Sequence, residues 1–141
     1  MKIENVLYQA KAIASGGREG RAESLVSPLV LELSTPQELG GAGGSGTNPE
    51  ELFSMGYSAC FLGAMKFVAA KEKMQLPQDM TVTGTVGIGV IPTGFGIRAE
   101  LEISLPGMDR DRAQMLIDKA HVVCPYSAAT RDNIEVELIL L

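Results

Sequence analysis

The chain contains two cysteines, Cys60 and Cys124, and both occupy positions that suit sulfur chemistry. Cys60 lies in an apolar run with a helical pattern, and Cys124 ends a second helical run directly before Pro125. A glycine-rich loop, residues 16–20, carries Arg18, whose guanidinium could stabilise a thiolate. Together these residues predict a thiol-based redox enzyme.

The two thiols are not expected to be equivalent. Cys124 is predicted to lie at the C-terminal end of a helix, where the negative pole of the helix dipole disfavours a thiolate. Cys60 lies in mid-helix and needs a cation to ionise, and Arg18 is the available one. We therefore predict that Cys60 is the attacking thiol and Cys124 the resolving thiol. Glu50, at a predicted helix N-terminus, can orient Arg18 through two hydrogen bonds.

Helix geometry restricts how these residues meet. Glu50 and Cys60 are ten residues apart, which is about 15 Å along a straight helix. One arginine cannot readily touch both within a continuous helix. Either the helix is broken near Gly56, or Arg18 and Glu50 come from a second subunit, and we favour a site shared between two chains.

The elements that must position these residues follow from periodicity and turn signals. Asn48, Pro49 and Glu51 form a helix-start pattern that opens a long helix, apolar nearly all round and therefore expected to be central. The element order predicts one α+β domain spanning residues 1–141, with antiparallel strand pairing. The expected strands cover residues 6–14, 21–23, 29–33, 81–90, 96–105 and 134–140, and the expected helices residues 49–73 and 109–123.

Composition narrows the function classes. The 141 residues carry a net charge of −5 and no cluster of Lys and Arg, which argues against nucleic-acid binding. No apolar run approaches the roughly 18 residues that cross a bilayer, so no membrane association is expected. The N-terminal residues alternate like a strand and lack a signal-peptide pattern, so we expect a cytoplasmic protein, where cysteines are more often catalytic or metal-binding than structural.

Three other interpretations remain open at this stage. Gly41, Gly43 and Gly46 form a G-x-G-x-x-G pattern, but the flanking elements do not fit a dinucleotide fold, and a flexible linker is favoured. His121 and Cys124 have metal-ligand spacing, yet too few ligands complete a zinc site, and a hydrogen-bonded histidine is favoured. Cys60 alone could be a small core residue.

Four segments resemble the organic hydroperoxide resistance (Ohr) proteins, one branch of the Ohr/OsmC superfamily. The resemblance covers essentially the whole chain, and the glycine-flanked arginine is similar to the Ohr branch rather than the OsmC branch. The segments are Gly16–Ala22, Thr47–Phe53, Ala59–Phe61 and Val123–Ser127.

This resemblance implies an intertwined homodimer in which antiparallel sheets wrap two central helices, with shared active sites. It implies a thiol peroxidase that binds no metal or other cofactor, reduces organic and fatty-acid hydroperoxides, and is recycled by dihydrolipoamide or lipoylated proteins. By position, Cys60 corresponds to the peroxidatic cysteine, Cys124 to the resolving cysteine, and Arg18 with Glu50 to the activating pair.

The residues around Cys60 also bear on substrate preference, and two other functions remain as alternatives. An apolar wall around Cys60 that includes Phe53, Met55 and Phe61 would favour alkyl hydroperoxides, although the same side chains could be core packing. An OsmC-branch peroxidase of broader specificity and a non-enzymatic redox-sensing or binding protein are the alternatives.

Overall fold

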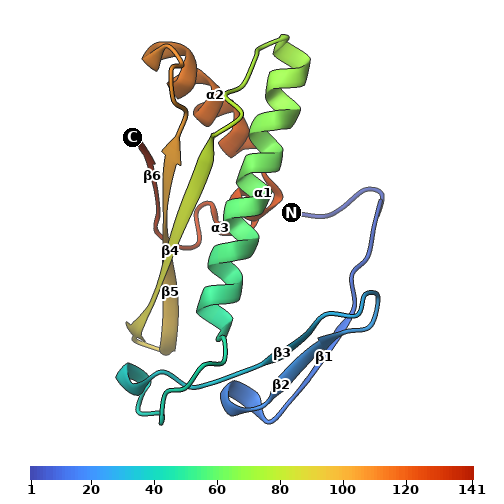
Figure 1. The fold of residues 1–141 in the computed structure, drawn as a ribbon, viewed down its shortest axis with the longest axis vertical. Helices are drawn as coiled ribbons and strands as arrows, with labels where there is room; N and C mark the ends of the chain where they lie inside the picture. Colours follow the sequence, from blue (N-terminus) through green and yellow to red (C-terminus); the bar gives the residue numbers. More distant parts are fainter. The chain divides into compact units, whose positions relative to one another are not determined.

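The computed structural model describes residues 1–141, and their contacts divide the chain into two units, Met1–Pro49 and Glu50–Leu141. Each unit contains one three-stranded sheet, and the second also contains the helices of the α+β fold (Figure 1). The predicted α+β class is therefore confirmed, while the homodimer remains a prediction.

The first unit is an antiparallel sheet of β1 (Ala12–Ser15), β2 (Arg21–Ser24) and β3 (Val30–Glu32), in that order. The first strand is shorter than the predicted 6–14, because its partner β2 ends at Ser24. The Ser24 side chain accepts hydrogen bonds from the N–H groups of Val26 and Ser27, both at 3.1 Å, and turns the chain away. The Lys11 carbonyl still accepts from the Leu25 N–H at 2.8 Å, but residues 6–10 have no strand of this chain to pair with.

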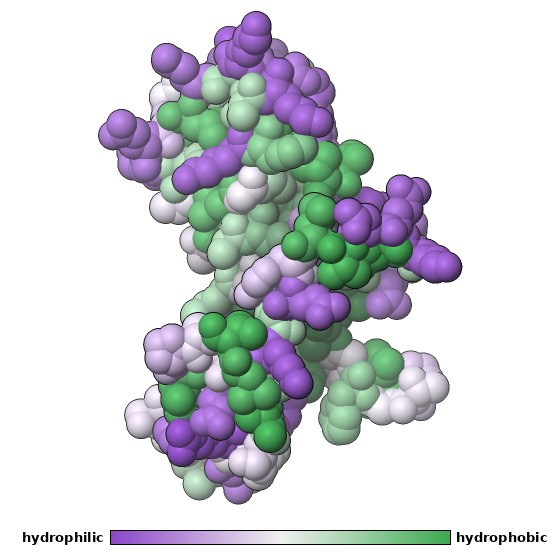
Figure 2. All heavy atoms as spheres, turned by 90° about the vertical axis from the view of Figure 1, so that its right-hand side faces the viewer, coloured by the Kyte–Doolittle hydropathy of each residue, from purple (hydrophilic) through white to green (hydrophobic).

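The first unit has no core of its own, because none of residues 1–49 is buried. Many of its large apolar side chains are exposed, and hydrophobic side chains reach the surface in the view of Figure 2. Since apolar area is stabilising mainly when it is removed from water, this unit needs a covering surface. The exposed apolar residues include Ile3, Leu7, Tyr8, Ile13, Leu25, Val26, Leu29 and Val30.

The glycine segment 40–46 is a hydrogen-bonded loop and not the flexible linker that was predicted. The N–H groups of Gly41 and Gly43 donate to the carbonyls of Pro36 and Thr35, at 3.1 and 3.0 Å. A Cβ at Gly41 would lie 2.3 Å from the Thr35 carbonyl oxygen. The glycines therefore allow the backbone to fold back on itself.

The second unit begins with α1 (Pro49–Glu72), close to the predicted 49–73. The predicted hairpin is formed by β4 (Thr81–Ile91) and β5 (Gly94–Ser104), and the last strand is β6 (Val136–Leu140). β6 pairs with β5 in parallel, so the prediction of purely antiparallel pairing was wrong. The helices between β5 and β6 return the chain to Ala99 in the middle of β5, where Val136 begins the parallel pairing, and this is the crossover that a parallel pair requires.

Helix α1 packs into the core of the second unit. Its buried residues are Tyr57, Phe61, Ala64, Met65, Val68 and Ala69. Ser54 donates to the Gly84 carbonyl at 2.6 Å, and a Cβ at Gly84 would lie 2.5 Å from Ser58 Oγ. This close approach of helix and strand requires glycine at position 84.

By length and composition α1 is sufficient to cross a membrane, with an 18-residue window of mean hydropathy 1.4, contrary to the expectation from sequence. Core helices of soluble proteins pass the same test, and 33% of that window is buried inside the protein. The side chains packed in the core favour the role of a core helix.

The chain between β5 and β6 contains two helices where one was predicted. Helix α2 (Arg110–Val123) begins after Asp109, whose side chain accepts from the Arg112 N–H at 3.1 Å. The short α3 (Pro125–Thr130) follows at once. Cys124 lies between them and is both the C-cap residue of α2 and the N-cap residue of α3.

Candidate active site

The two cysteines lie together, as their predicted roles require. The Cys124 thiol donates to Cys60 Sγ, with the sulfurs 3.6 Å apart. Cys60 is partly exposed, whereas Cys124 is fully buried. An oxidant from solution therefore reaches Cys60 first, and Cys124 lies behind it within reach of an oxidised Cys60.

Backbone hydrogen bonds fix the position of Cys124. Its N–H donates to the Ala120 carbonyl at 2.8 Å, and its own carbonyl accepts from the Ala128 N–H at 2.9 Å. Pro125 occupies the first position of α3, where its missing N–H costs nothing. The sequence signal for α3 was therefore Pro125 itself, interpreted only as a helix stop.

The surroundings of Cys60 within the second unit disfavour its thiolate. Burial raises the pKa of the Cys60 thiol, a hydrogen bond from the Tyr126 backbone N–H acts against this, and the neighbouring Cys124 raises it further. The Tyr126 N–H lies in the first turn of α3, where backbone donors have no partner within the helix and are free to bind a neighbouring group. One backbone donor does not reverse the rise in the pKa of Cys60, so a reactive Cys60 needs a cation from elsewhere, in agreement with the need predicted from the sequence.

Three aromatic rings pack beside the thiols. Phe53 and Tyr57 from α1 surround Tyr126, with ring centroids 5.6 Å apart in both pairs that include Tyr126. Gly56 makes room for Tyr126, since a Cβ there would lie 2.8 Å from the Tyr126 hydroxyl oxygen. The ring whose backbone reaches Cys60 is therefore held by close packing.

The predicted apolar wall divides into different environments. Phe53 is partly buried in the aromatic group, and Phe61 is fully buried in the core. Met55 is 53% exposed on α1. Phe61 therefore packs in the core, which was the alternative to its predicted place in the wall around Cys60.

Arg18 and Glu50 lie in different units. Arg18 is in the 3-10 turn Gly17–Glu19 between β1 and β2, and the turn begins after Gly16, whose φ of 74° suits glycine. Glu50 lies in the first turn of α1. Helix α1 continues without a break through Gly56, so the predicted arrangement with a helix broken near Gly56 is wrong. The placement of Arg18 at the thiols remains a prediction.

His121 is a hydrogen-bonded histidine, the interpretation favoured from the sequence. Its Nδ1 lies 2.8 Å from Ser127 Oγ. Burial and the neighbouring Arg131 lower the pKa of His121, while Asp118 acts in the opposite direction.

This lowered pKa predicts a pH-dependent stability. As the pH falls below the ordinary value of 6.5, the unfolded chain binds a proton at His121 before the folded chain does. The free energy of unfolding should therefore fall from about pH 6.5 down through the folded pKa of His121. Urea unfolding at several pH values should show this decrease, and His121→Asn should remove that part of it. Parallel profiles for both proteins would contradict the prediction.

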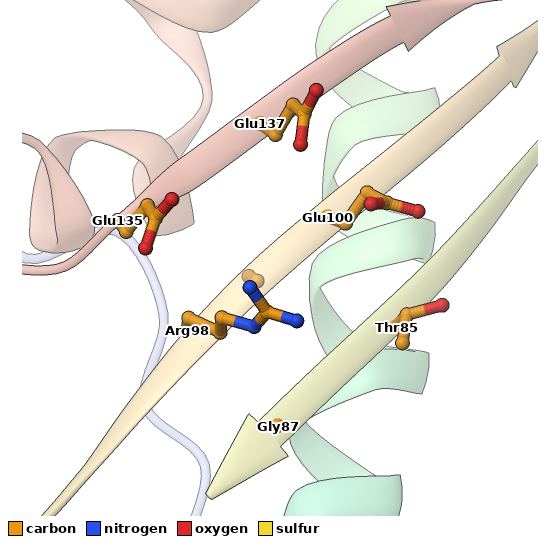
Figure 3. Close-up of a pocket in the computed structure, with 7 residues that line it drawn as sticks. Thr85, Gly87, Arg98, Glu100, Glu135 and Glu137 are labelled. Carbon is orange, nitrogen blue, oxygen red and sulfur yellow. The ribbon is translucent and has the colours of Figure 1, made fainter. Parts of the chain in front are cut away.

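A shallow pocket on the sheet β4–β5–β6 is a separate feature. Arg98 and Glu100 on β5 face it together with Glu135 and Glu137 (Figure 3). Glu100 is paired in register with Glu137. With three carboxylates around one guanidinium and no thiol, the pocket offers no net attraction for an anion and no redox group.

Comparison with known proteins identifies the family of the chain. Residues 41–139 match the family of OsmC-like proteins. The organic hydroperoxide resistance protein of Xanthomonas axonopodis pv. citri is 62% identical over 137 residues, covering 97% of this chain and 96% of that protein. OhrB of Bacillus subtilis is 39% identical over 136 residues, covering 95% of this chain and 98% of that protein.

Solved structures show the same fold. The crystal structure of OhrB of Bacillus subtilis gives a TM-score of 0.87 at 39% identity and covers 96% of this chain and 100% of that chain. An organic hydroperoxide resistance protein from Legionella pneumophila gives a TM-score of 0.91 at 42% identity, covering 96% and 98% of the two chains. The chain therefore belongs to the Ohr/OsmC family, among the organic hydroperoxide resistance proteins.

Proposed function

We propose that the protein is a thiol peroxidase that reduces organic hydroperoxides to alcohols. The observation that supports this most strongly is the pair of thiols 3.6 Å apart, one partly exposed and one buried, in a chain of this family. This arrangement suits an attacking thiol that meets the substrate and a resolving thiol that is shielded from it.

The reaction follows from the two sulfurs. The Cys60 thiolate attacks the distal oxygen of ROOH, the O–O bond breaks, and the alkoxide takes up a proton and leaves as ROH. Cys60 is then a sulfenic acid. Cys124 condenses with it, so that an S–S bond forms, the S–O bond breaks and water leaves. A dithiol reopens the disulfide by thiol–disulfide exchange.

Arg18 and Glu50 are proposed as the activating pair. Cys60 needs a cation because burial raises its pKa, and Arg18 lies in a tight glycine turn that can present a guanidinium. Glu50, at the positive end of α1, can hold that guanidinium in two hydrogen bonds. Since α1 is unbroken, we propose that Arg18 and Glu50 of one chain serve Cys60 of another.

A homodimer is supported by the surfaces of a single chain. Residues 1–49 contain no buried side chain, and α1 also carries exposed apolar or small residues at four-residue spacing. A second copy of the chain would cover both surfaces. The α1 residues concerned are Met55, Ala59, Gly63 and Phe67.

We further propose that dihydrolipoamide or a lipoylated protein is the reductant, that no cofactor is bound, and that the protein acts in the cytoplasm. The deciding experiment follows consumption of tert-butyl hydroperoxide by the purified protein with dihydrolipoamide. Hydrogen peroxide and monothiol reductants are compared under the same conditions.

The outcomes separate the alternatives. Fast turnover on the organic peroxide with the dithiol would support the proposal, and an equal rate with hydrogen peroxide would favour an OsmC-branch specificity. Disulfide formation without turnover by any reductant would favour a redox sensor. If both thiols stay reduced, the peroxidase proposal is wrong.

Substitution of the resolving thiol gives a specific prediction. Cys124→Ser should allow one turnover and then stop, because the Cys60 sulfenic acid has no partner and reacts with further hydroperoxide to sulfinic acid. Intact mass spectrometry after addition of excess hydroperoxide should detect two added oxygen atoms on the variant and a disulfide in the native protein. Sustained dithiol-driven turnover by the variant would show that Cys124 is not required.

A further inference from the structure

A chain of hydrogen bonds lies beside the thiol pair and joins three helices. His121 Nδ1 is 2.8 Å from Ser127 Oγ, which is 2.9 Å from the Tyr57 hydroxyl, which in turn is 3.2 Å from Thr130 Oγ1. Tyr57 and Ser127 are fully buried and Thr130 is 4% exposed. Buried hydroxyls need partners, so each of these contacts matters for stability.

When these three contacts and the bond from Thr130 to the Ser127 carbonyl are all made, counting hydrogens determines their direction. Each hydroxyl has one hydrogen to donate. Thr130 donates its hydrogen to the Ser127 carbonyl at 3.2 Å, so it must accept from Tyr57. Tyr57 has then used its hydrogen and must accept from the Ser127 hydroxyl. Ser127 in turn must accept from His121, which therefore carries a proton on Nδ1.

This direction has a consequence for protonation. The neutral His121 ring with its proton on Nδ1 and the doubly protonated ring both donate from Nδ1. The hydrogen-bond chain therefore survives a change of charge at His121. The opposite direction, in which Ser127 donates to Nδ1, would be broken by protonation.

The hydrogen-bond chain connects the elements that carry the two sulfurs. Tyr57 lies one turn before Cys60 on α1, and His121 lies three residues before Cys124 at the end of α2. Ser127 lies three residues after Cys124 in α3. The bonds thus attach both sides of the Cys124 junction to the helix that holds Cys60.

We propose that His121, Ser127 and Tyr57 form a positioning unit for the resolving step, which rests on the proposed peroxidase function. In that step the Cys124 sulfur bonds to the Cys60 sulfur, the S–O bond of the sulfenic acid breaks, and the hydroxyl leaves as water with the thiol proton. The unit keeps the α2–α3 junction at the separation from which Cys124 reaches Cys60. Its members act through the position of Cys124.

Tyr57→Phe tests this role because it keeps the ring and removes the hydroxyl. Under excess hydroperoxide without reductant, the ratio of over-oxidised Cys60 to disulfide should rise about three- to tenfold, the effect of one lost hydrogen bond. Intact mass spectrometry gives this ratio for the folded fraction that reacts. Thr93→Ala removes a hydroxyl from the exposed turn between β4 and β5, and it should leave the ratio unchanged.

Variants at His121 separate positioning from general packing. His121→Asn places an amide N–H near the position of Nδ1 and should give a ratio close to that of the native protein, whereas His121→Leu should raise it as Tyr57→Phe does. A native ratio in both Tyr57→Phe and His121→Leu would overturn the proposal.

A spectroscopic measurement does not depend on peroxidase activity. His121 is the only histidine in the chain, so its ring nitrogens can be assigned directly in a long-range ¹H–¹⁵N spectrum. We expect a protonated Nδ1 in the neutral ring, and a proton on Nε2 alone would overturn the assigned direction and the proposal with it. If the native protein forms neither disulfide nor over-oxidised product, the proposed function fails, and the spectrum still decides whether the chain of bonds exists.

Discussion

Cys60→Ser is expected to abolish hydroperoxide reduction, with a loss of about a thousandfold or more, as for removal of a nucleophile in other enzymes. A serine hydroxyl is not ionised near neutral pH and cannot form a sulfenic acid or a disulfide. The measurement is dithiol-driven consumption of tert-butyl hydroperoxide, with circular dichroism to show that the fold is retained. Cys60 is partly exposed and serine differs by one atom, so the fold should be kept.

Ser27→Ala is a suitable control, because it changes an exposed serine in a loop of the first unit. It should turn over at the native rate. If Cys60→Ser kept a tenth of the native rate or more, Cys60 would not be the attacking thiol. Cys124 would then have to attack from a fully buried position.

Arg18→Ala is expected to slow the attack on hydroperoxide by about a hundred- to a thousandfold near pH 7, through loss of both thiolate stabilisation and a donor to the peroxide oxygen. Burial raises the pKa of Cys60, and without a cation only a small fraction is thiolate at neutral pH. The rate of the variant should therefore increase as the pH is raised towards that pKa. Stopped-flow measurement of the reduced protein across pH checks both expectations.

A control variant and a mixed-dimer experiment test whether the effect is specific to Arg18 and whether the site is shared. Arg21→Ala removes an exposed arginine of β2 whose ion pair with Glu23 spans 3.2 Å, and it should leave the attack rate unchanged. Mixed dimers of Arg18→Ala and Cys60→Ser chains contain one intact site if the site is shared, and should regain activity. A native attack rate in Arg18→Ala would refute the activation by Arg18, and inactive mixed dimers would refute sharing.

The elements with local signals were predictable from the sequence. The start of α1 at Pro49, the hairpin of β4 and β5, and the start of α2 after Asp109 all lie within a residue or two of their expected positions. Each depends on a cap, a turn or a periodicity that acts over a few neighbouring residues.

The features that were missed depend on distant parts of the chain. The parallel pairing of β6 follows from the crossover of α2 and α3, which no pattern within β6 reveals. The first strand is short because β2 ends at Ser24, which residues 6–11 do not encode. Pro125 was interpreted as a stop, although proline is also typical of a first helical position.

The candidate site likewise contains some features with local sequence signals and others that depend on distant parts of the chain. The two cysteines could be assigned different roles from their positions along two helices, and the structure brings them together. The contribution of Tyr126 could not be predicted, because a backbone N–H has no signature in the sequence. The bonds from His121 to Thr130 join residues from three helices and likewise needed the fold.

Gly56 lies where an aromatic ring needs space beside the reactive thiol. The absence of a side chain there lets the Tyr126 ring lie against α1, one turn before Cys60. A methyl group at this position would lie 2.8 Å from the Tyr126 hydroxyl oxygen, so the ring would have to move away from the helix. A substitution at position 56 would therefore change the aromatic surroundings of Cys60, although glycine itself carries no functional group.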